Sequence, residues 1–285
     1  MTNAANSASQ WDPDQYARFR AERSQPFYDL AGLVERQPGL RVVDLGCGDG
    51  SLTKWLHEEL HAAETLGVDS SSSMLAQAGE RAGGGLSFEQ ADVSTWAPGR
   101  QFDLVFSNAA LQWVGGHEAL VPRIWELVAP GGQLAVQVPA NDQHTSHQIA
   151  EAAAAAAPWA TALGGVHRPF DRVRPAVRYA EMLYELGAVE QHVRLRIYPH
   201  ELPGVDQVVE WVKGTYLTAF ESRMSAELYA TYLEEYAKRL HAALGDKRPY
   251  LYTYPRILMW GRKAGLSGAG GHSDGRDEGT LAHGQ

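Results

Sequence analysis

The chain has 285 residues, of which 44% are hydrophobic, and a formal net charge of −9. Its acidic and basic side chains are scattered along the sequence, so neither nucleic acid nor an anionic membrane is expected as the main partner. No apolar run reaches the ~18 to 20 residues that a membrane-spanning helix needs, and the first residues do not resemble a secretory signal. Because Cys47 is the only cysteine, an intrachain disulfide is impossible, and we expect a cytoplasmic protein.

Both ends of the chain differ in composition from the middle. Residues 1–10 are small and polar, and residues 264–285 are rich in glycine and lack apolar periodicity. Such segments bury too little apolar surface to fold, so we expect both to be disordered. The remaining residues, 11–263, are expected to form one domain that begins with an opening helix at 11–36.

The first half of this domain alternates between strands and helices. The sequence predicts strands at 41–46, 64–69, 86–90, 102–108 and 132–138, and helices at 50–61, 71–82 and 117–129. Apolar strands that alternate with helices are typical of a doubly wound α/β fold, in which a mostly parallel sheet is covered on both faces.

The second half departs from this rhythm. The sequence predicts a helix at 171–187, a strand at 189–200, helices at 205–217 and 225–244, and a last strand at 252–263. We expect the last two strands to pair with each other and complete a seven-stranded sheet. The helices between them, at about 202–246, would form a small cap over the ligand edge. The run of alanines at 151–157 predicts a helix that ends at Pro158, and no chemistry is assigned to it.

The stretch "VVDLGCGDGS" at 42–51 carries the first functional signal. Gly46, Gly48 and Gly50 follow the first strand, where glycine permits a tight turn and lets a ligand approach the backbone. A dinucleotide fingerprint that starts at Gly46 would need a glycine at position 51, where Ser51 stands instead. This difference disfavours a nicotinamide-dependent oxidoreductase, which remains an alternative.

Polar residues also stand at the ends of the next three strands. Asp69 ends the second strand, where an acid can accept hydrogen bonds from both hydroxyls of an adenosine ribose. Asp92 follows the third strand and can accept from an adenine amino group, and Asn108 ends the fourth strand. Open α/β sheets bind ligands at this edge, so the four strand ends predict one shared crevice.

These motifs resemble those of the class I S-adenosylmethionine-dependent methyltransferases over residues 40–140. The resemblance covers "VVDLGCGDG", "GVDSSSSML" and "EQADVSTW". It implies S-adenosylmethionine as the cofactor. The cofactor-binding residues that it implies are Arg23, Asp44, Gly46, Cys47, Gly48, Asp69, Ser70, Met74, Asp92, Val93 and Asn108. Asp44 and the glycine backbone would hold the methionine moiety, Asp69 the ribose, and Met74 the adenine.

Each of these positions also has a purely structural explanation. An acid at a strand end often caps a helix, Met74 has core-like helical spacing, and Cys47 suits a turn as a small residue. No base or metal partner stands near Cys47 in the sequence, so nucleophilic thiol chemistry is not expected. The coincidence of four motifs, and not any single one, supports the assignment.

A second resemblance covers nearly the whole chain between its two ends. The segments "WDPDQY", "AERSQP", "NAALQWV" and "YPRILMWGRK" are similar to those of the trans-aconitate 2-methyltransferase family. Members of that family transfer a methyl group to one carboxylate of trans-aconitate. A carboxylate is already ionised at pH 7, so this reaction needs no general base, and no catalytic base or metal is expected.

The carboxylates that do not react need cations and hydrogen-bond donors. The candidate substrate-binding residues are Gln112, Trp113, Tyr198, His200, Trp211 and Arg256, and Arg23 is assigned to the cofactor carboxylate. Trp113 can face the sulfonium, because an aromatic face attracts a cation. The bulky aromatic residues are equally well explained as core, and the charged ones as solvent-facing.

One departure from the family bears on the acceptor. Where the family carries Gly-Leu-Arg-Pro after the cap's "WVKG", this chain has "TYLTAF" at 215–220 and no arginine before Arg223. A related carboxylic acid is therefore one alternative acceptor, and a natural-product hydroxyl or amine is another. A non-catalytic module that binds the cofactor is a third reading. We expect a monomer whose partner is a small-molecule carboxylate.

Overall fold

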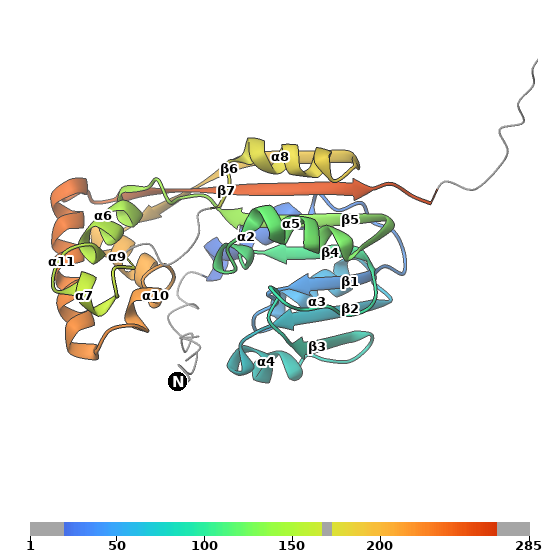
Figure 1. Cartoon of the computed structure of the whole chain (residues 1–285), viewed down its shortest axis with the longest axis horizontal. Helices are drawn as coiled ribbons and strands as arrows, with labels where there is room; N and C mark the ends of the chain where they lie inside the picture. Colours follow the sequence, from blue (N-terminus) through green and yellow to red (C-terminus); the bar gives the residue numbers. More distant parts are fainter. Residues whose placement is uncertain (1–19, 167–172, 267–285) are drawn as a thin grey trace, which may run out of the picture.

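The computed structural model describes residues 20–166 and 173–266. Its seven strands form one sheet in the order β3-β2-β1-β4-β5-β7-β6 (Figure 1). The strands are β1 (Arg41–Leu45), β2 (Glu64–Asp69), β3 (Leu86–Gln90), β4 (Phe102–Asn108), β5 (Val128–Pro139), β6 (Ala188–Leu202) and β7 (Tyr250–Lys263). The first five strands are parallel, and β7 is antiparallel to both β5 and β6. The predicted fold class and the pairing of the last two strands are confirmed.

Ten α-helices and one short 3-10 helix lie within the described residues. They are α2 (Arg20–Ala31), α3 (Ser51–Glu59), α4 (Ser72–Gly79), η1 (Leu111–Trp113), α5 (His117–Glu126), α6 (Thr145–Ala154), α7 (Trp159–Ala162), α8 (Ala176–Glu185), α9 (Val205–Lys213), α10 (Thr218–Glu221) and α11 (Ala226–Leu244). Of the opening helix expected at 11–36, the part before residue 20 lies outside the described residues, and so do both expected disordered ends except 264–266.

The sheet is buried on both faces, which explains why its strands read as continuous apolar runs. Val42 packs in one core with Phe27 and Leu30 of α2. Its neighbour Val43 packs in the other core with Ile124 of α5. Successive strand residues therefore face opposite layers, as the period of two requires.

The strands β6 and β7 form a long ribbon that extends beyond the sheet. β6 pairs with β7 along its whole length, whereas β5 pairs with β7 only from Arg256 to Arg262. The rest of the ribbon carries a separate hydrophobic core built with α6, α7, α9, α10 and α11. We call these five helices the cap. Figure 1 shows the cap at one end of β7, beyond the carboxyl ends of β1 and β4.

The sequence expectation of a cap from residues 202–246 alone was incomplete. α6 and α7, which lie between β5 and α8, belong to the same core. The alanines of α6 let another helix approach closely: Ala150 is fully buried and its carbonyl accepts a hydrogen bond of 2.9 Å from the Tyr232 hydroxyl of α11. The alanine run therefore has a packing role that its composition alone did not reveal.

Several helices end earlier than the sequence predicted. The helix expected at 117–129 ends at Glu126, because β5 begins at Val128 and includes the "APGG" turn. The helix expected at 205–217 ends at Lys213, and α10 follows it.

Among the described helices, none is both long enough and apolar enough to cross a membrane.

Candidate active site

The glycine loop, residues 46–50, connects β1 to α3, and its three glycines have different surroundings. Gly46, Gly48 and Gly50 have φ values of 81°, 57° and 72°, which favour glycine. A Cβ atom at Gly46 would lie 2.1 Å from the Cβ of Ala110, and one at Gly50 would lie 2.6 Å from the Phe88 ring. At Gly48 no heavy atom of the described chain, apart from Gly48 itself and its two chain neighbours, lies within 4 Å of that position. Packing therefore explains two glycines, whereas the position that a Cβ of Gly48 would take is open.

Asp69, at the end of β2, holds the glycine loop through its carboxylate. Its Oδ2 accepts a hydrogen bond of 2.9 Å from the Gly48 N–H, and its Oδ1 accepts one of 2.9 Å from the Ser71 N–H. Ser71 in turn caps α4 by accepting from the Met74 N–H. Met74 is half-buried and Ser70 is exposed. The structure thus brings Asp69, Ser70 and Met74 to the side of the loop where a ribose and a base are expected.

Asp44 lies behind the glycine loop and is only 2% exposed. Its Oδ2 accepts a hydrogen bond of 2.6 Å from the Thr53 hydroxyl of α3. Burial raises its pKa to about 7, although the bond from Thr53 opposes this shift and the charge of Asp69 adds to it. Asp44 therefore positions the loop against α3. Burial, followed by the charges of Asp44 and Asp69, raises the pKa of Cys47 as well, so this thiol stays protonated.

Asp92 and Val93 follow β3 at the same edge of the sheet. Asp69 pairs with Gln90 in the register of β2 and β3, so Asp92 comes two residues after that pair. Asp92 is exposed, and its Oδ1 accepts a bond of 2.8 Å from the Ser94 N–H. Val93 packs partly against the core. The strand ends of β1, β2 and β3 are thus adjacent, as the sequence predicted.

The turn after β4 closes the other side of the glycine loop. Ala109 has a φ of 53°, which is uncommon for a residue with a side chain, and its carbonyl accepts a bond of 2.6 Å from Gln112 Nε2. Asn108 Oδ1 and Gln112 Oε1 are buried and have no hydrogen-bond partner among residues 20–166 and 173–266. Two unpaired acceptors suit a ligand with several N–H donors, such as an ammonium group. Trp113 completes η1 and is half-buried.

Next to Asn108, across β5, a buried arginine marks the boundary between the sheet and the cap. Asn108 pairs with Gln137 of β5, and Pro139 of β5 pairs with Arg256 of β7. Arg256 is 5% exposed, its Nη1 donates to Gln137 Oε1 at 3.1 Å, and its guanidinium lies 4.8 Å from the ring centre of Tyr254. Gln137 is fully buried, and its Nε2 has no acceptor in the described part of the chain. The sequence prediction included Arg256 but missed Gln137.

Three other predicted residues lie in structural positions. The Tyr198 hydroxyl donates to Asp29 Oδ2 at 2.6 Å and so ties α2 to the ribbon. Trp211 is 1% exposed and packs in the cap core, with its ring 4.9 Å from that of His200. These two rings fill space between α9 and the ribbon, so Trp211 lies in the cap core and not at the sheet edge. The Arg23 side chain lies outside the described residues.

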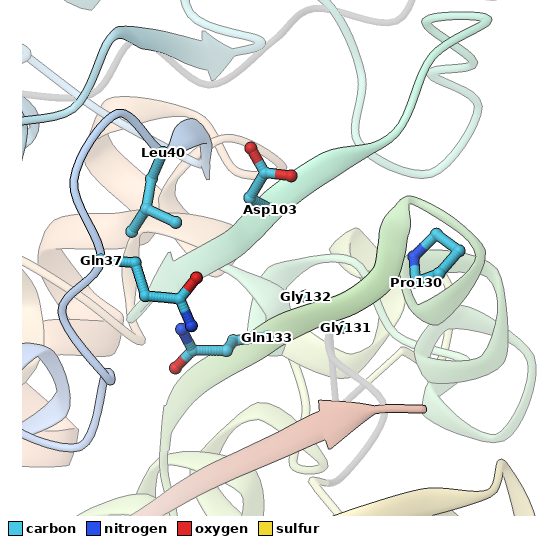
Figure 2. Close-up of a pocket in the computed structure, with 7 residues that line it drawn as sticks. All are labelled: Gln37, Leu40, Asp103, Pro130, Gly131, Gly132 and Gln133. Carbon is cyan, nitrogen blue, oxygen red and sulfur yellow. The ribbon is translucent and has the colours of Figure 1, made fainter. Parts of the chain in front are cut away.

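A separate hollow lies at the opposite edge of the sheet. Figure 2 shows its lining: Gln37, Leu40, Asp103, Pro130, Gly131, Gly132 and Gln133. Its polar side chains Gln133 and Asp103 are already paired: Gln133 Oε1 accepts from the Glu35 N–H and from Trp260 Nε1, each at 2.8 Å. The Asp103 carboxylate forms a salt bridge with Arg41. This hollow is a packing feature at the strand beginnings, far from the glycine loop.

Comparison with known proteins is consistent with this geometry. Residues 42–132 match the family described as a methyltransferase domain. Among solved structures, a methyltransferase of unproven activity from Bacillus halodurans superposes with a TM-score of 0.55 at 15% identity, over 84% of this chain and 99% of that one. Phosphoethanolamine N-methyltransferase 2 of Haemonchus contortus, in complex with S-adenosyl-L-methionine, gives 0.52 at 18% identity, over 85% of this chain and 52% of that one. These likenesses establish the fold.

Relatives with higher identity define the family. Trans-aconitate 2-methyltransferase of Deinococcus radiodurans is 42% identical over 255 residues, which cover 87% of this chain and 96% of that protein. The protein of the same name from Variovorax paradoxus is 40% identical over 258 residues, covering 89% and 98%. A third, from Streptomyces avermitilis, is 38% identical over 261 residues, covering 89% and 97%. The chain belongs to the trans-aconitate 2-methyltransferase family.

Proposed function

We propose that the protein transfers a methyl group from S-adenosylmethionine to one carboxylate of a small polycarboxylate, trans-aconitate, and forms a monomethyl ester. Relatives that align with this chain over nearly their full length at 38–42% identity are named trans-aconitate 2-methyltransferase. A structural neighbour was solved with S-adenosyl-L-methionine. The activity is assigned from the family together with the residues at the sheet edge.

The residues at the glycine loop fit the cofactor. The open side of Gly48 leaves room for the methionine moiety, and the unpaired oxygens of Asn108 and Gln112 suit its ammonium group. Asp69, with Ser70, would hold the ribose. Met74 would pack on the adenine, and Asp92 with Val93 would bind the adenine edge. When bound, the cofactor supplies an electrophilic methyl group.

The acceptor side has the charge that a polycarboxylate needs. Arg256 and Gln137 project from neighbouring strands on one face of the sheet, and Gln137 is the β5 partner of Asn108. Their task is to bind and orient the acid, because its carboxylate is already ionised and needs no base. The cap helps to exclude water from the carboxyl edge. The buried Arg256–Gln137 pair, one strand away from Asn108, is the observation that carries this proposal.

A direct assay tests the proposed function. The protein is incubated with methyl-labelled S-adenosylmethionine and a panel of acceptors: trans-aconitate, other di- and tricarboxylic acids, and small hydroxyl and amine compounds. Mass spectrometry should find a base-labile monomethyl ester of a polycarboxylate, together with S-adenosylhomocysteine. Label on a hydroxyl or amine acceptor and none on any acid would contradict the proposal.

A further inference from the structure

Polar side chains gather in the cap where the chain leaves β5 and begins α6. We call Asn141, Ser146, His147 and Tyr252 the cap polar cluster. Their exposed fractions are 4%, 0%, 7% and 0%. They come from the loop after β5, from α6 and from β7. Polar groups this deeply buried normally have partners, so their hydrogen bonds indicate what the cluster does.

The histidines of this region form a neutral framework. His144 Nδ1 accepts a hydrogen bond of 3.1 Å from the Ser146 N–H, so this nitrogen carries no proton. Ser146 Oγ lies 2.8 Å from His144 Nδ1 and 3.2 Å from His147 Nδ1. Burial, with a smaller effect of His144, lowers the pKa of His147 to about 3. Both rings are therefore uncharged at pH 7. Glu151, one turn farther along α6, accepts a bond of 2.8 Å from the Tyr216 hydroxyl.

Two polar groups of the cluster have no partner at full hydrogen-bond geometry. Asn141 Nδ2 and the Tyr252 hydroxyl are buried, and neither finds an acceptor within the described ranges. They are close to each other: burial raises the pKa of Tyr252, whereas side-chain hydrogen bonds of its hydroxyl with Ser146 and Asn141, which do not reach full hydrogen-bond geometry, lower it. A buried polar group without a partner is unfavourable, because it has lost its hydrogen bonds to water. Two such groups in one place suit an external oxygen as their acceptor.

The cluster continues the acceptor side of the site into the cap. Tyr252, Tyr254 and Arg256 alternate along β7 and so share one face, over about 13 Å at ~3.3 Å per residue. The chain after β5 crosses this interval, because Pro139 pairs with Arg256 and the Ala140 N–H donates to the Pro255 carbonyl at 2.9 Å. Asn141 is the next residue of this crossing chain, and it interacts with Tyr252.

We propose that Asn141 and Tyr252 donate hydrogen bonds to a carboxylate of the acceptor that is not methylated. The inference rests on the proposed function and identifies a second, uncharged subsite beside Arg256. Neutral donors bind an anionic oxygen through directed bonds, so they select its position more than its charge. The preferred acceptor is then an acid that carries at least one carboxylate besides the one that is methylated. Asn141 and Tyr252 act as specificity-determining residues.

Two substitutions and one matched control test this subsite. Tyr252→Phe removes only the hydroxyl, and Asn141→Asp replaces the donor by an acceptor. Tyr232→Phe makes the same deletion in the same core, where the hydroxyl is already paired with the Ala150 carbonyl. We expect both test variants to raise the KM for trans-aconitate about 10- to 100-fold, as the loss of a hydrogen bond to a charged group predicts. Their kcat, their KM for S-adenosylmethionine and all constants of the control should stay within about twofold to threefold.

A truncated acceptor separates recognition from stability. With an acid that lacks one carboxylate, the effect of Tyr252→Phe on KM should shrink to about twofold. A loss that is equally large for the truncated acid, or test variants that behave like Tyr232→Phe, would overturn the subsite alone. Calorimetric binding of trans-aconitate in the presence of S-adenosylhomocysteine gives a second measurement that needs no turnover. A wild-type protein that neither binds nor methylates any polycarboxylate would overturn the proposed function, and the subsite with it.

Discussion

Three aspartates at neighbouring strand ends have three different environments. Asp44 is buried against α3, Asp69 accepts two backbone N–H groups, and Asp92 is exposed. The sequence predicted their common edge, because the carboxyl ends of parallel strands lie together. It could not predict their burial, which depends on the Thr53 side chain and on the packing of α3. The same residue type is therefore buried at one strand end, bonded to loop backbone at the next and exposed at the third.

The buried Asp44 predicts a specific dependence of stability on pH. Its pKa in the folded protein is about 7, against 3.8 for the ordinary side chain. Between these values the folded state keeps a proton that the unfolded state has released, so stability falls as pH rises from about 4 to about 7. Asp44→Asn keeps an oxygen for Thr53 but has no such proton. The variant should therefore gain stability relative to wild type on going from pH 5 to pH 8, by up to about 3 kcal/mol at 1.36 kcal/mol per pKa unit. Urea unfolding at both pH values measures this, and an equal difference at the two values would contradict it.

At the scale of elements, the glycine loop and the turn after β4 are built as one unit. The sequence analysis explained all three glycines by a tight turn and by ligand approach, and it did not predict their packing contacts. In the structure Gly46 packs on Ala110 and Gly50 packs on Phe88, which are far away in the sequence. These contacts join β1 to β4 and to β3, so no local pattern could reveal them. Ala109, which has a positive φ, directly precedes the Ala110 of this contact.

The different surroundings of Gly46 and Gly48 predict different defects. Gly46→Ala should lower the free energy of unfolding by about 2–5 kcal/mol, because its Cβ meets Ala110 and its φ is positive. Gly48→Ala adds a methyl group to open space, so it should lower stability by only about 1–2 kcal/mol. It should nevertheless weaken S-adenosylmethionine binding at least about tenfold. Denaturant unfolding and calorimetry separate the two effects. A Gly46→Ala protein as stable as wild type, or unchanged cofactor affinity in Gly48→Ala, would refute this account.

At the scale of the whole molecule, the β6–β7 ribbon joins the cofactor sheet to the cap. The sequence predicted the seven strands, because each has a strong local periodicity. It also predicted the α/β fold class and the pairing of the last two strands. It missed α6 and α7 as cap helices, since an alanine-rich helix shows its role only through tertiary contacts. It also missed Gln137 and Asn141. The rule that strand ends carry ligand-binding residues was applied to the first four strands, and "QVPAND" at the end of β5 satisfies the same rule.

The junction of sheet and cap also sets two arginines side by side. Arg196 of β6 and Arg256 of β7 are directly paired in the register, an arrangement that like charges disfavour. The side chain of Arg196 is 46% exposed and lies 2.9 Å from the carboxylate of Asp29. Arg256 is buried beside Gln137, toward the end of the sheet that carries the cap. This pair therefore offers a test and a matched control at adjacent positions of one ribbon.

Substitution of the two arginines should separate acceptor binding from the general effect of losing a positive charge. Arg256→Gln removes the buried charge and should raise the KM for trans-aconitate about 10- to 100-fold, because hydrogen bonds to a charged group contribute about 1.5–3 kcal/mol. Its KM for S-adenosylmethionine should change less than about threefold, since the glycine loop is on the other side of β4. Arg196→Gln should leave both constants within about twofold, because an exposed ion pair contributes little. Steady-state kinetics with each substrate varied in turn provides the measurement. Equal effects of Arg256→Gln on the two substrates, or equal effects of the two variants on the acid, would show that Arg256 supports the fold and does not bind the acceptor.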